Sequence, residues 1–79
     1  MKTDIQENEV PSTQIEEVLY HLKYLGSMTS YRAIREYGIT RLAARIHNLR
    51  AEDWNIRSRD IDFTTRHGRK SHYTEYYIE

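Results

Sequence analysis

Apolar residues recur at helical spacing in the first part of the chain. Between residues 13 and 25 they fall three or four positions apart, as on one face of a helix: Ile15, Val18, Leu19, Leu22 and Leu25. Thr13 and Glu16 have the spacing of a capping box at the start of this stripe. Gly26 supplies a left-handed stop after it. The pattern predicts a first helix that begins near Thr13 and ends at Gly26.

Two shorter helices are predicted next. The second begins after Thr29, which acts as its N-cap, and ends at Gly38. Its apolar positions are Tyr31, Ala33, Ile34 and Tyr37. The third opens at Thr40, a second N-cap, and ends around residues 50–53. Its apolar face consists of Leu42, Ala43, Ile46 and Leu49.

From Trp54 onward the chain is rich in β-branched and aromatic residues, which are typical of strands. Two such runs flank the polar residues 66–70, and Gly68 lies between them, so the pattern predicts a β-hairpin. Trp54, Ile61 and Phe63 are expected to form the core beneath this hairpin. The coarse order is helix, helix, helix, strand, strand, which defines an α+β domain over residues 12–79. Residues 1–11 are polar and acidic, and we expect them to form a disordered tail.

Composition narrows the function classes. The chain has 79 residues, enough for one small domain, which is too small to enclose a deep substrate cavity. It has no cysteine, which excludes disulfides and thiolate metal sites. The four histidines lack metal-ligand spacing, and no nucleophile–base pair stands out. We therefore expect no enzyme, no metal and no cofactor.

The apolar runs are too short for a membrane span and no signal-peptide pattern is present, so we expect a cytoplasmic or nucleoid-associated protein.

Charge is distributed unevenly along a chain whose net charge is zero. Residues 31–50 contain five arginines against one acidic residue, Glu36, and the hairpin turn contains Arg66, Arg69 and Lys70. The acidic residues are concentrated elsewhere, with five of them in the first 30 positions. The two basic stretches predict a local cationic surface, although a charged helix face can also serve solubility alone.

Two helices joined by a tight turn, the second with a basic outer face, are typical of a helix-turn-helix. The second helix of such a motif enters the major groove of DNA. Its candidate contact residues are Thr40, Arg41, Ala44, Arg45 and Asn48. Arginine pairs with guanine and asparagine with adenine, and a small alanine permits close approach. His47 is expected at the edge of this face.

Further contacts are expected around this helix. The hairpin turn would bind the DNA backbone or the minor groove through Arg66, His67, Arg69 and Lys70. Weaker backbone contacts are expected from Thr29, Ser30, Arg32 and Arg35. For Arg32 and Arg35, plain solvation is an equal alternative.

Residues 14–78 resemble small winged helix-turn-helix DNA-binding proteins common in phages and prophages. The most specific part is Tyr37-Gly38-Ile39, followed by residues 41–46, Arg-Leu-Ala-Ala-Arg-Ile. Asp53 departs from the family pattern, which often has glycine before the aromatic residue that opens the first wing strand. Aspartate tolerates the left-handed conformation better than most residues, so we expect the turn to be kept.

The resemblance and the basic faces together predict sequence-specific binding of double-stranded DNA, with a role in transcriptional regulation. One alternative is an architectural or excisionase-like factor that bends DNA. Another is a protein-interaction module that uses the same fold without DNA. Because a single module buries little DNA surface, we also expect a homodimer or a second protein beside it.

Overall fold

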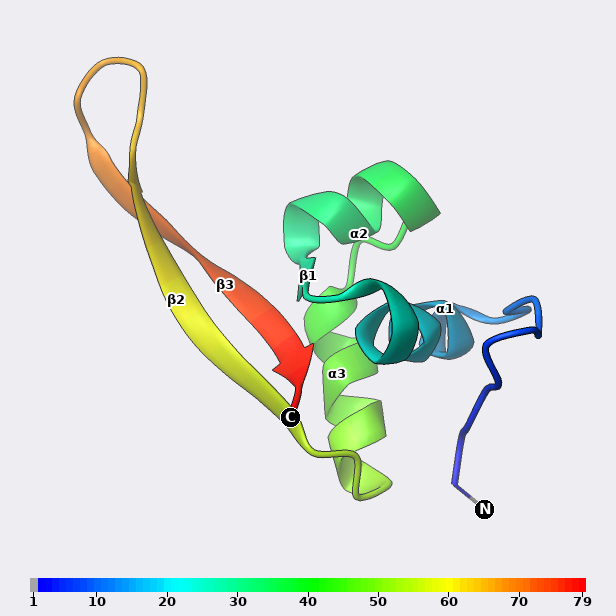
Figure 1. The fold of residues 1–79 in the computed structure, drawn as a ribbon. Helices are drawn as coiled ribbons and strands as arrows, with labels where there is room; N and C mark the ends of the chain where they lie inside the picture. Colours follow the sequence, from blue (N-terminus) through cyan, green and yellow to red (C-terminus); the bar gives the residue numbers. More distant parts are fainter. Residues whose placement is uncertain (1) are drawn as a thin grey trace.

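The computed structural model describes residues 2–79 and shows a helical body from which a long hairpin extends (Figure 1). In chain order, the elements are α1 (Gln14–Tyr20), the π-helical turn η1 (His21–Leu25), β1 (Met28–Thr29), α2 (Ser30–Tyr37), α3 (Leu42–Ala51), β2 (Ile56–Thr64) and β3 (Lys70–Ile78). The predicted α+β order of three helices and a hairpin is confirmed. The π-helical turn and the short strand β1 are features that the periodicity did not predict.

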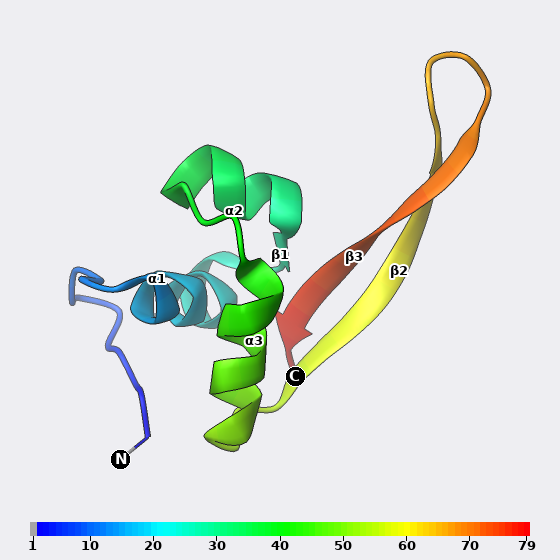
Figure 2. The same cartoon turned by 180° about the vertical axis from the view of Figure 1, so that it is seen from behind.

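The three strands form one antiparallel sheet in the order β1-β3-β2. β1 pairs with the inner part of β3, where Met28 lies opposite Tyr76. β2 pairs with β3 along its whole length, from Ile56 opposite Ile78 to Thr64 opposite Lys70. The outer half of the hairpin is therefore two-stranded and extends away from the helices, as Figures 1 and 2 show from both sides. This extension gives the molecule its length of 46 Å against 22 and 19 Å in the other directions.

A single core lies between α1, α3 and the inner part of the sheet. Its buried members are Ile5, Val18, Leu19, Leu22, Met28, Ala33, Ile39, Leu42, Ile46, Leu49 and Ile56. The helical spacings of three and four predicted most of these residues because they place side chains on one face. Each fully buried aliphatic side chain of this kind contributes about 1.5–3 kcal/mol to folding.

The predicted caps of the first two helices are present. Thr13 accepts a hydrogen bond from the Glu16 backbone N–H (3.2 Å), and Thr29 accepts one from Arg32 (3.2 Å). The Glu16 carboxylate, however, accepts from the backbone and hydroxyl of Ser12. These hydrogen bonds lower the pKa of Glu16.

Several residues expected on the inner faces of the helices lie in solvent. Leu25, Tyr31 and Ile34 are exposed, whereas Ala33 between the last two is buried. The eight-residue helix α2 buries only a narrow stripe against the body, formed by Ala33 and the partly buried Tyr37, so Tyr31 and Ile34 remain in solvent. Phe63, expected beneath the hairpin, is also exposed because β2 extends beyond the core at that point.

The N-terminal segment, residues 2–9, differs from the disordered tail that its composition suggested. Ile5 is only 2% exposed and belongs to the core. The indole N–H of Trp54 donates to the Thr3 carbonyl (2.8 Å), and both the backbone N–H and the hydroxyl of Thr3 donate to the Glu52 carboxylate. Lys23 forms an ion pair with Asp4 at 2.7 Å. One apolar residue among acidic ones gives no periodic signal, yet distant side chains hold this segment against α1 and the end of α3.

His21 is a buried polar residue at the junction of α1 and η1. Its Nε2 lies 3.0 Å from the Ser27 carbonyl, which can only accept, so Nε2 carries the proton. Its Nδ1 then accepts from the Tyr37 hydroxyl at 2.7 Å. Burial lowers the pKa of His21, and burial also raises that of Tyr37. The neutral imidazole therefore joins the end of α2 to the loop before β1.

No helix in residues 2–79 has the length and apolar character needed to cross a membrane. The same part of the chain contains no cluster of three or more His, Asp or Glu side chains arranged to hold a metal ion.

Candidate nucleic-acid interface

The turn between α2 and α3 is fixed by one glycine and one buried residue. Gly38 has a φ of 66°, in the left-handed region that ends helices, and its N–H donates to the Ile34 carbonyl at 3.0 Å. Ile39 follows and is fully buried, so the chain must turn back toward the core before α3 begins. This arrangement is the turn of a helix-turn-helix.

The start of α3 differs from the prediction. The helix begins at Leu42, its N-cap residue is Arg41, and no side chain caps it. The Arg41 carbonyl accepts hydrogen bonds from Ala44 (3.1 Å) and Arg45 (3.4 Å), so Thr40 lies one residue outside the helix. The assignment of Thr40 as the N-cap is therefore wrong, although its exposed hydroxyl lies in the turn beside the helix start.

The outward face of α3 is accessible and carries polar side chains between small ones. Leu42, Ile46 and Leu49 face the core, so helical geometry places Ala44, His47, Asn48 and Ala51 on the opposite side. His47 and Asn48 are exposed, and so is Arg41 at the start of the helix. His47 thus lies within this face, where the sequence pattern had placed it only at the edge. Ala43, expected in the core, is exposed.

Arg45 occupies a different position from the other candidate contact residues. It follows Leu42 by three positions and precedes Leu49 by four, so it borders the core-facing side of α3. The residue is half-buried, and its Nε is buried with no hydrogen-bond partner within residues 2–79. Its stem packs against the body, and only the end of its guanidinium is available to an external partner.

The hairpin formed by β2, β3 and their connecting loop, called the wing below, has a tightly specified turn. Thr65 and Arg69 close the loop through a backbone hydrogen bond of 2.8 Å, and the Gly68 N–H donates to the Thr65 carbonyl at 2.9 Å. Gly68 has a φ of 87°, in the left-handed region that the last position of the three-residue turn 66–68 requires. The predicted turn is confirmed. Its Arg66, His67, Arg69 and Lys70 side chains are all exposed at the end of the molecule farthest from the helices (Figure 1).

Side chains at the base of the wing hold it in place. Arg50, in the last turn of α3, donates from Nε to the Ile56 carbonyl at 2.9 Å, and its guanidinium lies 5.8 Å from the centre of the Tyr76 ring. Asp53 has a φ of 69° in the connection that follows α3, and so adopts the left-handed conformation expected of it. These features fix where β2 starts relative to the end of α3. Sequence reasoning assigned Arg50 no role, because its partner is a backbone carbonyl.

A second set of hydrogen bonds joins the wing to the loop before β1. Glu75 on β3 accepts from Arg59 on β2 (2.6 Å) and from the Ser27 hydroxyl (2.8 Å). The hydrogen bond from Arg59, followed by that from Ser27, lowers the pKa of Glu75. The ionised carboxylate thus braces the hairpin at the level where β1 ends.

Near the start of α2, a surface hollow of about 470 Å³ contains several of the predicted backbone-contact residues. It is lined by Ser27, Thr29, Tyr31, Arg32, Arg35, Glu36 and Glu75. Arg32 and Arg35 are exposed, and Arg32 lies 3.3 Å from Glu36 in a solvent-exposed pair. Ser30 is exposed as well, at the first position of the helix.

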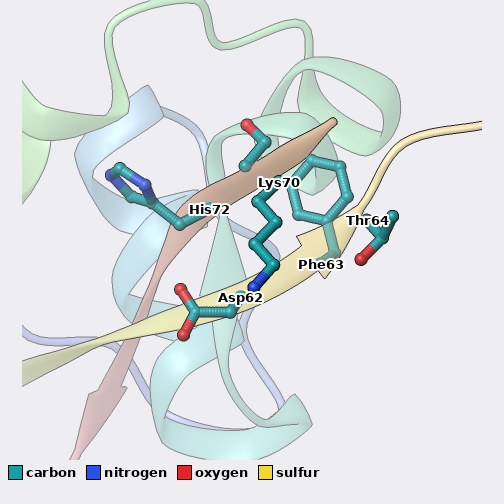
Figure 3. A pocket seen from close by; sticks show the side chains of 6 residues that line it. Asp62, Phe63, Thr64, Lys70 and His72 are labelled. Carbon is teal, nitrogen blue, oxygen red and sulfur yellow. The ribbon is translucent and has the colours of Figure 1, made fainter. Parts of the chain in front are cut away.

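The outer wing carries another hollow, of about 410 Å³, drawn in Figure 3. Its side chains come from both strands: Asp62, Phe63, Thr64, Lys70, Ser71 and His72. His72 lies opposite Asp62 in the strand register, so it does not face His67 in the turn.

A helix-turn-helix followed directly by an antiparallel hairpin, with strand order β1-β3-β2, defines a winged helix-turn-helix domain. A family model described as "Winged helix-turn-helix domain" matches residues 13–79, and the chain belongs to this family. No curated protein and no solved structure gives a significant match to the chain. Membership in this family suggests DNA binding.

Proposed function

We propose that the protein binds double-stranded DNA sequence-specifically and regulates transcription. In this proposal α3 lies in the major groove, and the wing contacts the adjacent backbone or minor groove. The observation that carries the proposal is the accessible outward face of α3 beside a wing whose turn presents Arg66, Arg69 and Lys70 to solvent. Arg50 links these two elements, so they would meet DNA in a fixed relation.

Base readout is assigned to the exposed residues of α3. Asn48 suits adenine, while Arg41 suits guanine or a phosphate near the helix start. His47 joins them, since it shares the same face, and Ala44 leaves room for the groove edge. Arg45 has a supporting role in this account, because its buried stem directs only the guanidinium end toward a phosphate.

The wing and α2 supply contacts that do not depend on sequence. Arg66, Arg69 and Lys70 would neutralise phosphates or enter the minor groove, and His67 would contact the backbone beside them. Arg32 and Arg35, with the hydroxyls of Thr29 and Ser30, would contact the opposite backbone strand of the groove. Thr40 would add a phosphate contact from the turn.

The experiment that tests this proposal is selection from a random duplex library, followed by affinity measurements on the selected site. Asn48→Ala is expected to lower specific affinity by about 1–3 kcal/mol and to relax the preference at one base pair. Lys70→Ala is expected to weaken all sequences alike and to reduce the salt slope by about one unit. Arg57→Ala is the matched control, since Arg57 pairs with Glu79 at the base of the hairpin (2.8 Å) and lies outside the proposed contacts.

The Arg45→Ala variant tests whether Arg45 has a supporting role, in packing and phosphate contact, or reads a base directly. We expect this variant to lose folding stability as well as DNA affinity, whereas Asn48→Ala loses DNA affinity alone.

A library that returns no enriched sequence, together with wing variants that bind duplex as the wild type does, would refute the proposal. A straight DNA path in the complex would count against the architectural alternative. Failure to bind duplex even at low salt would favour a protein-interaction module, for which the exposed Tyr31 and Ile34 on α2 are the supporting observation.

A further inference from the structure

Exposed aromatic side chains from α2 and from both strands of the wing surround one hollow between α2 and the wing. Tyr31 in the first turn of α2 is 72% exposed, and Phe63 on β2 and Tyr73 on β3 are each 43% exposed. They line a hollow of about 500 Å³, called the α2–wing hollow below. Its full lining is Thr29, Ser30, Tyr31, Phe63, His72 and Tyr73. Figure 3 shows Phe63 where it projects from the outer wing.

The fold accounts for only part of this exposure. The rings of Phe63 and Tyr73 contact each other across the hairpin, with centroids 5.8 Å apart, and such a pair stabilises a two-stranded ribbon. Each residue nevertheless keeps nearly half of its surface in solvent. Tyr31 adds nothing to the core, because Ala33 forms the buried stripe of α2. Three aromatic faces around one opening leave a surface that packing alone does not require.

The chemistry of the hollow matches a nucleobase better than an aliphatic side chain. Aromatic rings offer flat surfaces for stacking, and a base has two such faces. The Thr29 and Ser30 hydroxyls offer hydrogen bonds to a polar edge. The Thr29 oxygen already accepts from Arg32, which leaves its proton free to donate. An aliphatic occupant would leave these polar groups unpaired.

Cations lie on both sides of the α2–wing hollow. Beyond it along the wing are Arg66, Arg69 and Lys70. Beside it is the neighbouring hollow, which shares Thr29 and Tyr31 with it and is lined by Arg32 and Arg35 together with Glu36 and Glu75. Asp60 and Asp62 alternate with Ile61 and Phe63 along β2, and therefore project from the other face of the hairpin, together with the His72 side chain opposite Asp62. A base in the hollow would thus have cations near the phosphates on either side of it.

We propose that the α2–wing hollow binds an unpaired nucleobase by stacking on Tyr31, Phe63 and Tyr73. The protein then favours DNA in which a duplex adjoins a single strand or an extruded base. This inference rests on the proposed DNA binding and adds a structural preference to it. Because stacking does not depend on base identity, the preference is for DNA structure and not for a further sequence element.

The test compares three DNAs that share one duplex, at low salt, where binding is sequence-independent. The first has blunt ends, the second carries a short single-stranded tail, and the third carries a tail of abasic sugars with the same number of phosphates. Stacking of one base is expected to tighten binding of the normal tail on the order of tenfold over the abasic tail. A 2-aminopurine base placed in the tail is expected to lose fluorescence when the wild-type protein binds, a readout that needs no variant.

Two substitutions locate the effect. Phe63→Leu and Tyr73→Leu keep apolar side chains on the hairpin while removing the flat rings, and both are expected to abolish the gain from the normal tail. Tyr77→Leu is the matched control, because Tyr77 lies nearer the hairpin base beside Arg59 and does not line the hollow. Circular dichroism verifies that each variant is folded.

The outcomes separate the two proposals. Equal affinity for normal and abasic tails, with 2-aminopurine fluorescence unchanged, would overturn the stacking inference while duplex binding stands. Absence of binding to all three DNAs would overturn both. Self-association that is lost in Tyr73→Leu, without any tail preference, would show that a second copy of the chain occupies the hollow and would also refute the inference.

Discussion

Replacement of Ile5 by alanine tests whether the N-terminal segment is part of the folded domain. Ile5 is 2% exposed, and the substitution removes three carbon atoms from the core. At about 0.8 kcal/mol for each buried methylene-sized group, the transfer loss is about 2.4 kcal/mol. The residual cavity should add little, because residues 2–9 lie at the surface and can collapse onto the gap. We therefore expect Ile5→Ala to lower the free energy of unfolding by about 2–3 kcal/mol.

Urea denaturation followed by circular dichroism measures this change. With a slope of about 1 kcal/mol per molar urea, the midpoint should fall by about 2 M. Trp54 is the only tryptophan, and its indole donates to the Thr3 carbonyl, so its fluorescence reports on the same segment. Val10→Ala is the matched control, because Val10 is 88% exposed, and its effect should stay within about 0.5 kcal/mol. Equal midpoints for Ile5→Ala and Val10→Ala would refute the packed arrangement of residues 2–9.

Three further substitutions address the turns and the buried imidazole. Because burial lowers the pKa of His21, the unfolded chain binds a proton there more readily below pH ~6.5. The free energy of unfolding, measured by urea denaturation from pH 7.5 to 5.5, should therefore fall by at most about 1.4 kcal/mol per pH unit, and by less in His21→Asn. An equal fall in both proteins would exclude His21 as the source. Gly38→Ala should cost about 1–2 kcal/mol from the left-handed φ alone, since an added Cβ meets no atom within 4 Å. Asp53→Gly should raise stability by about 0.5–1 kcal/mol, and an unchanged urea midpoint would show that no strain resides there.

The sequence predicts the elements that depend on local or periodic signals. The stripe of Val18, Leu19 and Leu22 and the hydroxyl caps at Thr13 and Thr29 follow from helix geometry alone. The glycine-containing turn of the wing is equally local, because only a few backbone conformations close such a loop. The order of elements and the helix-turn-helix therefore could be inferred without coordinates.

What the sequence could not predict depends on distant contacts. Ile5 is buried because side chains far along the chain, such as Trp54, hold its segment in place. Arg45 has the composition of an outward contact residue, but its position beside Leu42 and Leu49 turns its stem toward the body. Tyr31 has the spacing of a core residue, yet α2 is too short and too peripheral to bury it. In each case, the burial of the side chain is determined by which surfaces the neighbouring helices and loops cover.

The central claim is that DNA binds along α3 and the wing turn. Titration of the isotopically labelled protein with a selected duplex, followed through backbone amide chemical shifts, tests it most directly. The account predicts that the largest changes fall in α3, Leu42–Ala51, and in the wing turn, residues 65–70, while the buried stripe of α1 changes little. Shift changes confined to other surfaces, or no change at saturating duplex, would contradict it.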